Sequence, residues 1–197
     1  MKPFIVFSLV TTLAGALLVA AQDAPKDAPQ DASSAAGPAT SPTPEHRWLQ
    51  QHVGEWESVT KMLAGPDLPE AETRSLDRVR KVGEFWTLTE AEAAPGGSPF
   101  TAVLTLGYDP EKASFVGTWI DSTSSMLWHY TGKLDEAGQA LTLETEGPLP
   151  WDPSARGRYR EIWEFQGPDH RTFTSTVQKE DGTWMPWVKT ESRRKGT

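Results

Sequence analysis

Cysteine is absent from the 197-residue sequence. Its absence excludes a disulfide-stapled scaffold, thiol catalysis, iron–sulfur clusters and every zinc site with cysteine ligands. Histidine is scarce as well: there are four, and none lies in an HxH or HxxxH pattern, so the sequence predicts neither a metal site nor another cofactor. Basic residues are outnumbered, and a formal net charge of −8 argues against a nucleic-acid-binding protein, which needs a basic surface.

The first 21 residues have the layout of a secretory signal peptide. Lys2 supplies one early positive charge, an apolar run extends from Phe4 to Val19, and the segment ends in small residues at Ala21. Because this run is short for a stable membrane span, we expect cleavage near Ala21 and a mature protein that is secreted or periplasmic. The alternative is an uncleaved N-terminal anchor.

Residues 22–44 contain almost only alanine, proline, aspartate, serine, glutamine and threonine, with no aromatic and no large aliphatic side chain. Such a segment cannot bury enough apolar surface to offset the entropy lost on ordering, so we predict a disordered linker. The remaining residues, 45–194, are enough for one domain with a buried core.

The domain has the pattern of an all-β protein. Residues 45–53 predict a short helix that ends at Gly54, and no later segment has the apolar period of a long helix. Short alternating segments follow, separated by turn residues. We predict an antiparallel up-and-down barrel of about ten strands, because closure removes exposed strand edges. The predicted strands are Glu55–Leu63, Thr73–Val82, Glu84–Glu92, Phe100–Tyr108, Ser114–Ser122, Ser125–Leu134, Ala140–Glu146, Arg158–Gln166, Arg171–Glu180 and Thr183–Ser192.

One predicted hairpin gives a register that can be checked. A tight turn at Thr123-Ser124 would place Trp119 opposite Trp128. Asp121 would share their face, and His129 would lie on the other face. Several strands carry polar and apolar side chains on both faces, which favours a barrel with a partly polar, ligand-sized cavity. The alternative is that some of these apolar side chains pack under loops.

A G-x-W motif at Gly54-Glu55-Trp56 follows the predicted helix, and an arginine pair at 193–194 follows the last predicted strand. Further motifs lie between them, at Glu45-His46 with Leu49, Gly107-Tyr108-Asp109, Trp119-Ile120-Asp121-Ser122, Gly132, Asp135, Gly138, Leu141-Thr142-Leu143, Asp152-Pro153 and Arg160. Through this ordered set, residues 45–194 resemble the bacterial calycin-like family known only as domain of unknown function 1579. The chain departs from the family pattern at Val82-Gly83-Glu84, where a Gly-Gly-Arg/Lys turn is expected.

The resemblance implies a lipocalin-like barrel and no particular activity. In such barrels a basic side chain from the last strand lies across the first-strand tryptophan and closes one end. The resemblance therefore assigns this structural role to Trp56 and to the arginine pair, from which we nominate Arg193. The contact combines a cation–π interaction with apolar coverage.

Residue types of a hydrolytic triad occur together in Asp121, Ser125 and His129. The predicted register separates His129 from Asp121, and no nucleophile elbow is present, so we nominate no catalytic residue. An enzyme that uses Asp121, His129 or Arg160 in a polar cavity is an alternative. Related nitrobindin barrels bind haem through one histidine, so a haem-binding barrel that uses His129 or His170 is another.

The segment Arg158-Tyr159-Arg160 suggests an anion site, because lipid-binding barrels hold carboxylates with arginine and tyrosine. Tyr159 points opposite to both arginines in a strand. Inward-facing arginines could hold an anion. Outward-facing arginines, which we favour, would pair with neighbours such as Glu144 or Glu161.

We expect the barrel to bind a small apolar or amphipathic ligand in its interior, and this expectation implies no reaction chemistry. All nine tryptophans lie in residues 45–194 and could supply core packing or the walls of the site. The sequence leaves the ligand and the oligomeric state open. The candidate cavity residues are Trp86, Trp119, Asp121, Trp128, His129, Arg160 and Trp163.

Overall fold

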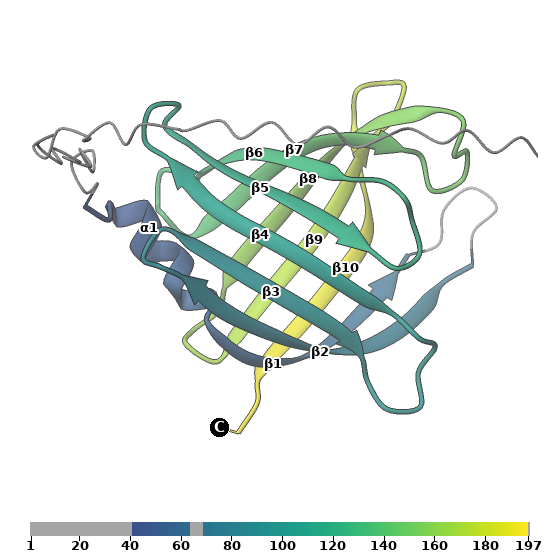
Figure 1. Cartoon of the computed structure of the whole chain (residues 1–197). Helices are drawn as coiled ribbons and strands as arrows, with labels where there is room; N and C mark the ends of the chain where they lie inside the picture. Colours follow the sequence, from purple (N-terminus) through teal and green to yellow (C-terminus); the bar gives the residue numbers. More distant parts are fainter. Residues whose placement is uncertain (1–40, 64–68, 197) are drawn as a thin grey trace, which may run out of the picture. The chain divides into compact units, whose positions relative to one another are not determined.

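The computed structural model describes residues 41–63 and 69–196, so the predicted signal peptide and most of the predicted linker lie outside it. The described residues form ten strands: β1 (Gly54–Met62), β2 (Ala71–Val82), β3 (Trp86–Ala93), β4 (Thr101–Asp109), β5 (Ser114–Asp121), β6 (Trp128–Leu134), β7 (Ala140–Pro148), β8 (Arg156–Phe165), β9 (His170–Gln178) and β10 (Trp184–Arg194). Each strand pairs antiparallel with the next, and β1 pairs with β10 (Figure 1). The predicted closed, all-β barrel is confirmed.

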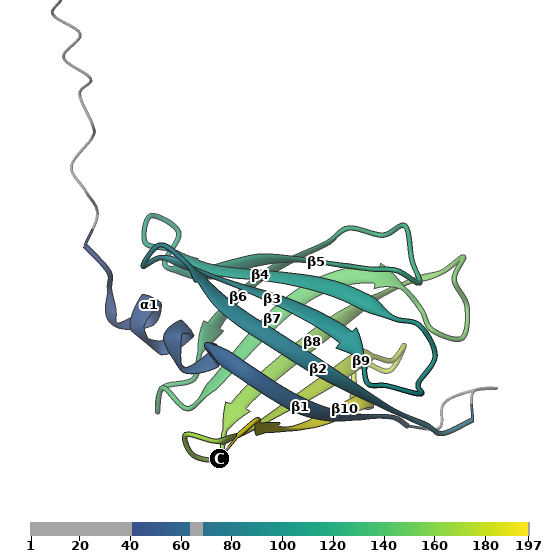
Figure 2. The same cartoon turned by 60° about the horizontal axis from the view of Figure 1, so that its bottom comes forward.

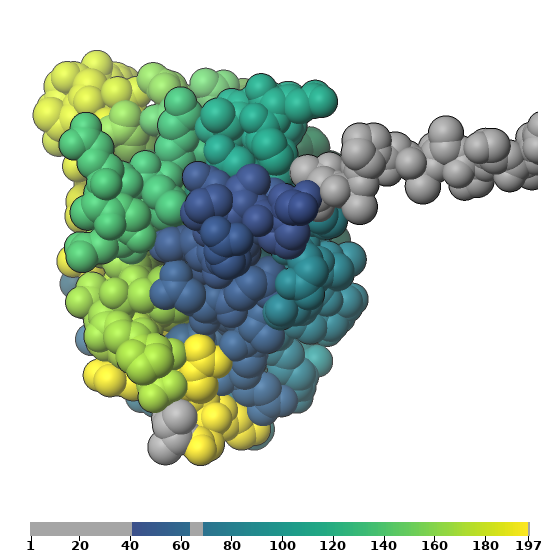
Figure 3. All heavy atoms as spheres, turned by 90° about the vertical axis from the view of Figure 1, so that its left-hand side faces the viewer, coloured from purple at the N-terminus to yellow at the C-terminus, as the bar shows by residue number. Residues whose placement is uncertain are grey.

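A short helical segment covers one end of the barrel. Helix α1 spans Pro44–Leu49, and one 3-10 turn continues it over Gln50–His52. Trp48 and Leu49, the last two residues of α1, have buried side chains. Figure 2 shows α1 beside the start of β1, and Figure 3 shows it over the centre of the end that faces the viewer. We call this end the helix end and the opposite one the far end. No helix in residues 41–63 or 69–196 is long and apolar enough to cross a membrane.

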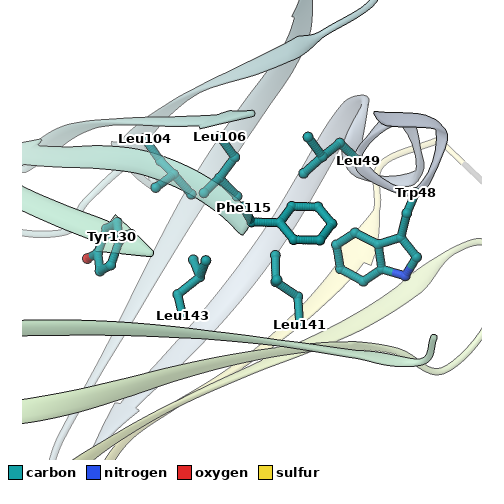
Figure 4. Close-up of a cluster of buried hydrophobic side chains, with 8 residues drawn as sticks. All are labelled: Trp48, Leu49, Leu104, Leu106, Phe115, Tyr130, Leu141 and Leu143. Atoms are coloured by element: carbon teal, nitrogen blue, oxygen red, sulfur yellow. The ribbon is translucent and has the colours of Figure 1, made fainter. Parts of the chain in front are cut away.

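The apolar core fills the barrel next to α1 (Figure 4). The Trp48 indole packs edge-on against Phe115 and Phe165, with ring centroids 5.9 and 5.5 Å apart. Tyr130 lies at the end of the cluster farthest from α1, with its hydroxyl on the side away from Trp48. The buried cluster consists of Trp48, Leu49, Leu104, Leu106, Phe115, Tyr130, Leu141 and Leu143.

The seam between β1 and β10 is closed over Trp56, which is fully buried. A basic side chain covers its ring as expected, but the residue is Arg194, whose Cζ lies 4.2 Å from the ring centroid. The nomination of Arg193 is corrected, because Arg193 is exposed. The register explains the difference: Trp56 pairs directly with Arg194, and residues paired across two strands share a face of the sheet.

Candidate functional site: the barrel interior

Strand register identifies the side chains that face the barrel interior. Trp119 pairs with Trp128 in the β5–β6 hairpin, as predicted. Asp121 pairs with Ala102, which is buried in the interior, and Trp163 pairs with a fully buried leucine of β7. Because paired residues share a face, these four candidate residues point inward.

Trp86 and His129 face outward, so they do not line the interior as we expected. Trp86 is 40% exposed, and its ring covers the backbone of Gly107 from outside. His129 is exposed on the outer face of β6. His170 is also on the outer surface, where its Nε2 contacts a carboxylate oxygen of Glu191. Strand alternation therefore places both histidines considered for haem away from the interior.

The side chains of Arg158 and Arg160 point outward from the barrel, the orientation that we favour from the sequence. The Arg160 Nε donates a hydrogen bond of 3.1 Å to Glu144, and an Arg158 nitrogen lies 3.8 Å from the same carboxylate. The Arg160 Cζ also lies 4.2 Å from the ring centroid of Trp184. Arg160 is thus removed from the candidate cavity residues. Glu161 alternates with these arginines and points inward, so it is not their partner.

The three polar side chains considered for acid–base chemistry do not lie together in one site. Asp121 faces the interior, whereas His129 and Arg160 lie on the outer surface. A catalytic site built from these three side chains is excluded by their positions. Across residues 41–63 and 69–196, no three acidic or histidine side chains gather in a cluster that could hold a metal ion.

A buried ion pair lies beneath Trp56 at the helix end. The Arg171 Nη2 donates to the Asp77 Oδ2 at 3.1 Å, and the two side chains are 1% and 10% exposed. Asp77 also accepts hydrogen bonds of 2.7 and 2.8 Å from Ser58 and Ser75. Burial lowers the pKa of Arg171 to about 10, although the Asp77 carboxylate opposes this effect. Within this buried pair the Arg171 Nε has no hydrogen-bond partner among the described residues.

Arg171 also determines the protonation of His52. Its Nη1 lies 3.0 Å from the His52 Nδ1, and a guanidinium can only donate, so the neutral ring carries its proton on Nε2. Burial, and then the positive charge of Arg171, hold the pKa of His52 well below its usual value. The ring packs edge-on against Trp163 and Phe165. This cluster separates the helix end from the middle of the barrel.

Glu161 is buried in the interior without a basic partner in the part of the chain that the structure describes. The residue is 8% exposed. Its Oε1 accepts a hydrogen bond of 3.0 Å from Ser175, while its Oε2 has no hydrogen-bond partner among the described residues. Burial raises the pKa of this carboxyl to about 8, although the Ser175 hydrogen bond opposes the shift. At pH 7 the group is therefore mostly protonated.

A bulge in β10 brings Trp187 to the inner side of the sheet. The register of β10 against β9 shifts between Pro186 and Val188, which leaves Trp187 between two paired residues. Its Nε1 donates a hydrogen bond of 3.1 Å to the Ser175 Oγ, which in turn donates to Glu161. This chain of hydrogen bonds fixes the position of the buried carboxyl group.

Tyr130 and Asp121 add polar groups to the interior. Burial, and then the charges of Glu161 and Asp121, raise the pKa of the Tyr130 hydroxyl. Burial alone would raise the pKa of Asp121, but hydrogen bonds from Thr123 and Trp119 outweigh it and hold the pKa below its usual value. The Trp119 bond, from Nε1 to Oδ2, is 2.9 Å long. Asp121 is therefore ionised at neutral pH.

The inner face of the sheet is not fully covered in the middle of the barrel. Several inward-facing side chains near the middle of β1, β2, β3, β9 and β10 are only half-buried, although the sheet covers them from outside. The solvent-accessible surface of these side chains must border space within the barrel. The residues are Thr60, Ser75, Thr89, Phe173 and Thr190.

Sequence reasoning missed Glu161 and Arg171 as interior residues. The sequence does contain a signal for Glu161. Glu161 alternates in phase with Tyr159 and Trp163 along β8, so it is the one acidic residue on the aromatic face of that strand. Arg171 has no local signal, since its partner Asp77 is 94 residues away along the chain. Only the assembled barrel brings the two together.

The fold and its sequence can be compared with known proteins. None of the curated proteins matches the chain. The crystal structure of Rv2717c from M. tuberculosis aligns with 78% of this chain and 98% of its own, at 12% identity and a TM-score of 0.53, which shows a similar fold. A redesigned β-barrel aligns with 76% of this chain and 94% of its own at 10% identity, with a TM-score of only 0.39. The family model described as "Protein of unknown function (DUF1579)" matches residues 41–194, and the chain therefore belongs to this family.

Proposed function

We propose that the protein binds a small amphipathic molecule inside the barrel. The observation that carries the proposal is the buried carboxyl group of Glu161, whose Oε2 lacks a hydrogen-bond partner among the described residues. A buried polar atom without a partner costs free energy, and a ligand that bonds to it removes that cost. The half-buried inward-facing side chains border the space in which such a ligand would lie.

The aromatic side chains of this interior suit the apolar part of a ligand. Trp163 and Phe173 pack with ring centroids 4.7 Å apart, and Trp128 packs edge-on against Tyr159 at 5.3 Å. Aromatic rings offer large apolar faces at fixed positions. A molecule with one polar end and a flat or apolar remainder would match both the rings and the buried carboxyl group.

We also propose that binding takes place outside the cytoplasm. The support is the sequence of residues 1–21, in which one lysine, an apolar run and terminal small residues follow in the order of a signal peptide. A secreted or periplasmic barrel would meet its ligand in solution or at the cell envelope.

The uncharged dye N-phenyl-1-naphthylamine, which fluoresces more strongly in apolar surroundings, tests interior binding. We expect saturable binding to one site per chain. Thr190→Phe, which fills interior space, should weaken binding by about fivefold or more, whereas Thr131→Phe on the outer face of β6 should leave it unchanged. Native mass spectrometry of protein purified from its own host should show a bound small molecule. A lack of saturable dye binding would contradict the proposal.

A further inference from the structure

We infer that the polar end of the ligand is an amine or ammonium group, which Glu161 and Tyr130 bind in the middle of the barrel. The inference rests on the proposed interior site and specifies the chemical class of its ligand. Four observations carry it: the charges that face inward, the unpartnered oxygen atoms, the aromatic walls and the protonation of Glu161.

The inward-facing ionisable groups that lack an ion-pair partner among the described residues are acidic. On the described strands, two arginines lie on the inward side, Arg171 and Arg194, and both stack on Trp56 at the helix end. Each is paired with an aspartate, at 3.1 Å in both cases. Glu161 and Asp121 also face inward, and neither has an ion-pair partner among the described residues. An incoming anion would meet these two acids, while both inward-facing arginines are already paired with aspartates, so a cation is favoured.

The unpartnered oxygens suit an N–H donor. The Glu161 Oε2 is buried with no hydrogen bond. The Tyr130 hydroxyl also makes none within residues 41–63 and 69–196. Leu143 of β7 pairs with Gly132 of β6 and with Glu161 of β8, so Tyr130, two residues from Gly132, faces the interior one strand away from Glu161. An ammonium group carries up to three N–H donors, enough for both oxygens. A carboxylate or phosphate group carries only acceptors, and the two inward-facing arginines are already paired with aspartates.

The aromatic walls favour the same class of ligand. A cation over the face of an aromatic ring is attracted by the negative potential of that face, most strongly for tryptophan. Trp163 and Phe173 face the interior next to the strand positions of Glu161 and Ser175. Trp187, whose Nε1 is bound to Ser175, adds a third ring on this side. A carboxyl group among aromatic rings is a general arrangement for amine recognition.

A proton balance follows from this site. The groups that face Glu161 are Ser175 on β9, Tyr159 on β8 and Tyr130 on β6, while β7 presents an apolar leucine; Asp121 on β5 acts on Tyr130. With its pKa raised to about 8 by burial, Glu161 is protonated in the empty barrel at pH 7. When an ammonium ion binds, the carboxyl O–H bond breaks, one proton leaves to solvent, and the ammonium N–H groups donate to the carboxylate. Affinity should then rise by about tenfold from pH 6 to pH 7 and by about fivefold from pH 7 to pH 8, as the fraction of ionised carboxyl grows.

Three probes of equal chain length separate the classes of ligand: octylamine, octanol and octanoate. Calorimetric titration of the purified protein at pH 8 should show octylamine binding at least about tenfold more tightly than octanol, and octanoate most weakly. Glu161→Gln should remove the preference for the amine but keep dye binding. Glu164→Gln, on the exposed outer face of the same strand, is the matched control and should keep the preference. From pH 6 to pH 8, octylamine affinity should rise in the wild type and stay flat in Glu161→Gln.

The outcomes separate the inference from the proposed function. If octanol or octanoate binds as tightly as octylamine, or if the dye binds and octylamine does not, the inference of an amine ligand is wrong. The proposal of interior binding would still stand. An amine preference that survives Glu161→Gln also overturns it. If neither the dye nor any probe binds, the proposed function fails and the inference fails with it. Saturable dye binding by Glu161→Gln shows that this variant is folded.

Discussion

The guanidinium of Arg194 lies over the indole of Trp56, 4.2 Å from the ring centroid, and so joins the last strand of the barrel to the first. The same side chain donates hydrogen bonds to the backbone carbonyls of Val53 at 2.7 Å and Pro168 at 2.9 Å. One residue of the last strand therefore connects the first strand, the helical segment and the β8–β9 turn. Its loss should weaken all three.

Replacing Arg194 with alanine should lower the free energy of unfolding by about 2 kcal/mol, because a cation–π contact and charged hydrogen bonds are both lost. Urea denaturation followed by tryptophan fluorescence measures the change. Arg193→Ala is the control, and it should shift stability by less than about 0.5 kcal/mol since the side chain is exposed. Equal effects of the two variants would contradict the assignment of Arg194 to barrel closure.

Asp77→Asn should be more costly, because it leaves the buried guanidinium of Arg171 without its anion. Breaking one side of a buried pair destabilises a protein by about 3–5 kcal/mol. Adding Arg171→Met to Asp77→Asn should restore part of the loss, since no uncompensated charge remains. Glu57→Gln removes an exposed carboxylate from β1 and serves as the control. The prediction fails if the double variant is no more stable than Asp77→Asn in the same urea titration.

The stability of the barrel should fall as pH rises from about 6.5 to 8. Between about pH 5 and 6.5 the lowered pKa of buried His52 works in the opposite direction, because unfolded His52 binds a proton there that the folded residue does not. In the higher range folded Glu161, with its pKa raised to about 8 from the usual 4.5, holds a proton that the unfolded chain has lost. The slope approaches about 1.4 kcal/mol per pH unit for one proton. Glu161→Gln should lack this component and be the more stable protein at pH 8, whereas Glu164→Gln should follow the wild type. Parallel curves for the wild type and Glu161→Gln would show that the carboxyl is not buried in this way.

Gly147→Ala should displace Trp128 from its place inside the barrel. A Cβ at residue 147 would lie 2.1 Å from the nearest atoms of the Trp128 ring, far inside contact distance. Overpacking of this kind costs about 1–3 kcal/mol. Combining Gly147→Ala with Trp128→Leu should recover stability by making room. If Gly147→Ala alone leaves the thermal midpoint and the tryptophan emission unchanged, the ring does not lie against Gly147.

The N-terminal segment should be removed during export. Intact-mass measurement of protein from the extracellular or periplasmic fraction of its own host should correspond to a chain that begins at or near Gln22, after cleavage near Ala21. A variant with a lysine at Leu13, in the middle of the apolar run, should stay in the cytoplasm at full length. Full-length wild-type protein in the cytoplasm would contradict the proposed location.

The sequence predicts the local parts of this structure well. Alternation and turn residues are properties of neighbours along the chain, so strands and hairpins can be read from them. Trp119 lies opposite Trp128 as predicted, even though β6 starts only at Trp128 and the turn before it is longer than two residues. The helix at 45–53 is likewise found, with its last turn tightened to 3-10 geometry.

Features that depend on the whole barrel were not predictable in the same way. Trp86 and Trp163 lie in similarly alternating strands, and only the complete ring of strands decides that Trp163 faces in. Counting outward from a two-residue turn at Asp181-Gly182 would place Pro186 opposite Val177, but Trp184 pairs with Gln178, so Met185 lies opposite Val177. The bulge at Trp187 then brings Val188 opposite Ser175. The bulge depends on packing of one indole inside the barrel, and no local residue pattern announces it.

Closure through β1 and β10 also sets the order in which the barrel can assemble. Every other strand pair joins consecutive strands, whereas the pairing of Trp56 with Arg194 encloses all the strands between them in one loop. The entropy lost on closing a loop grows with its length. We therefore expect the consecutive hairpins to form first and this seam last. In hydrogen exchange of the native protein, the amides of the β1–β10 pair should open at the lowest cost among the strands.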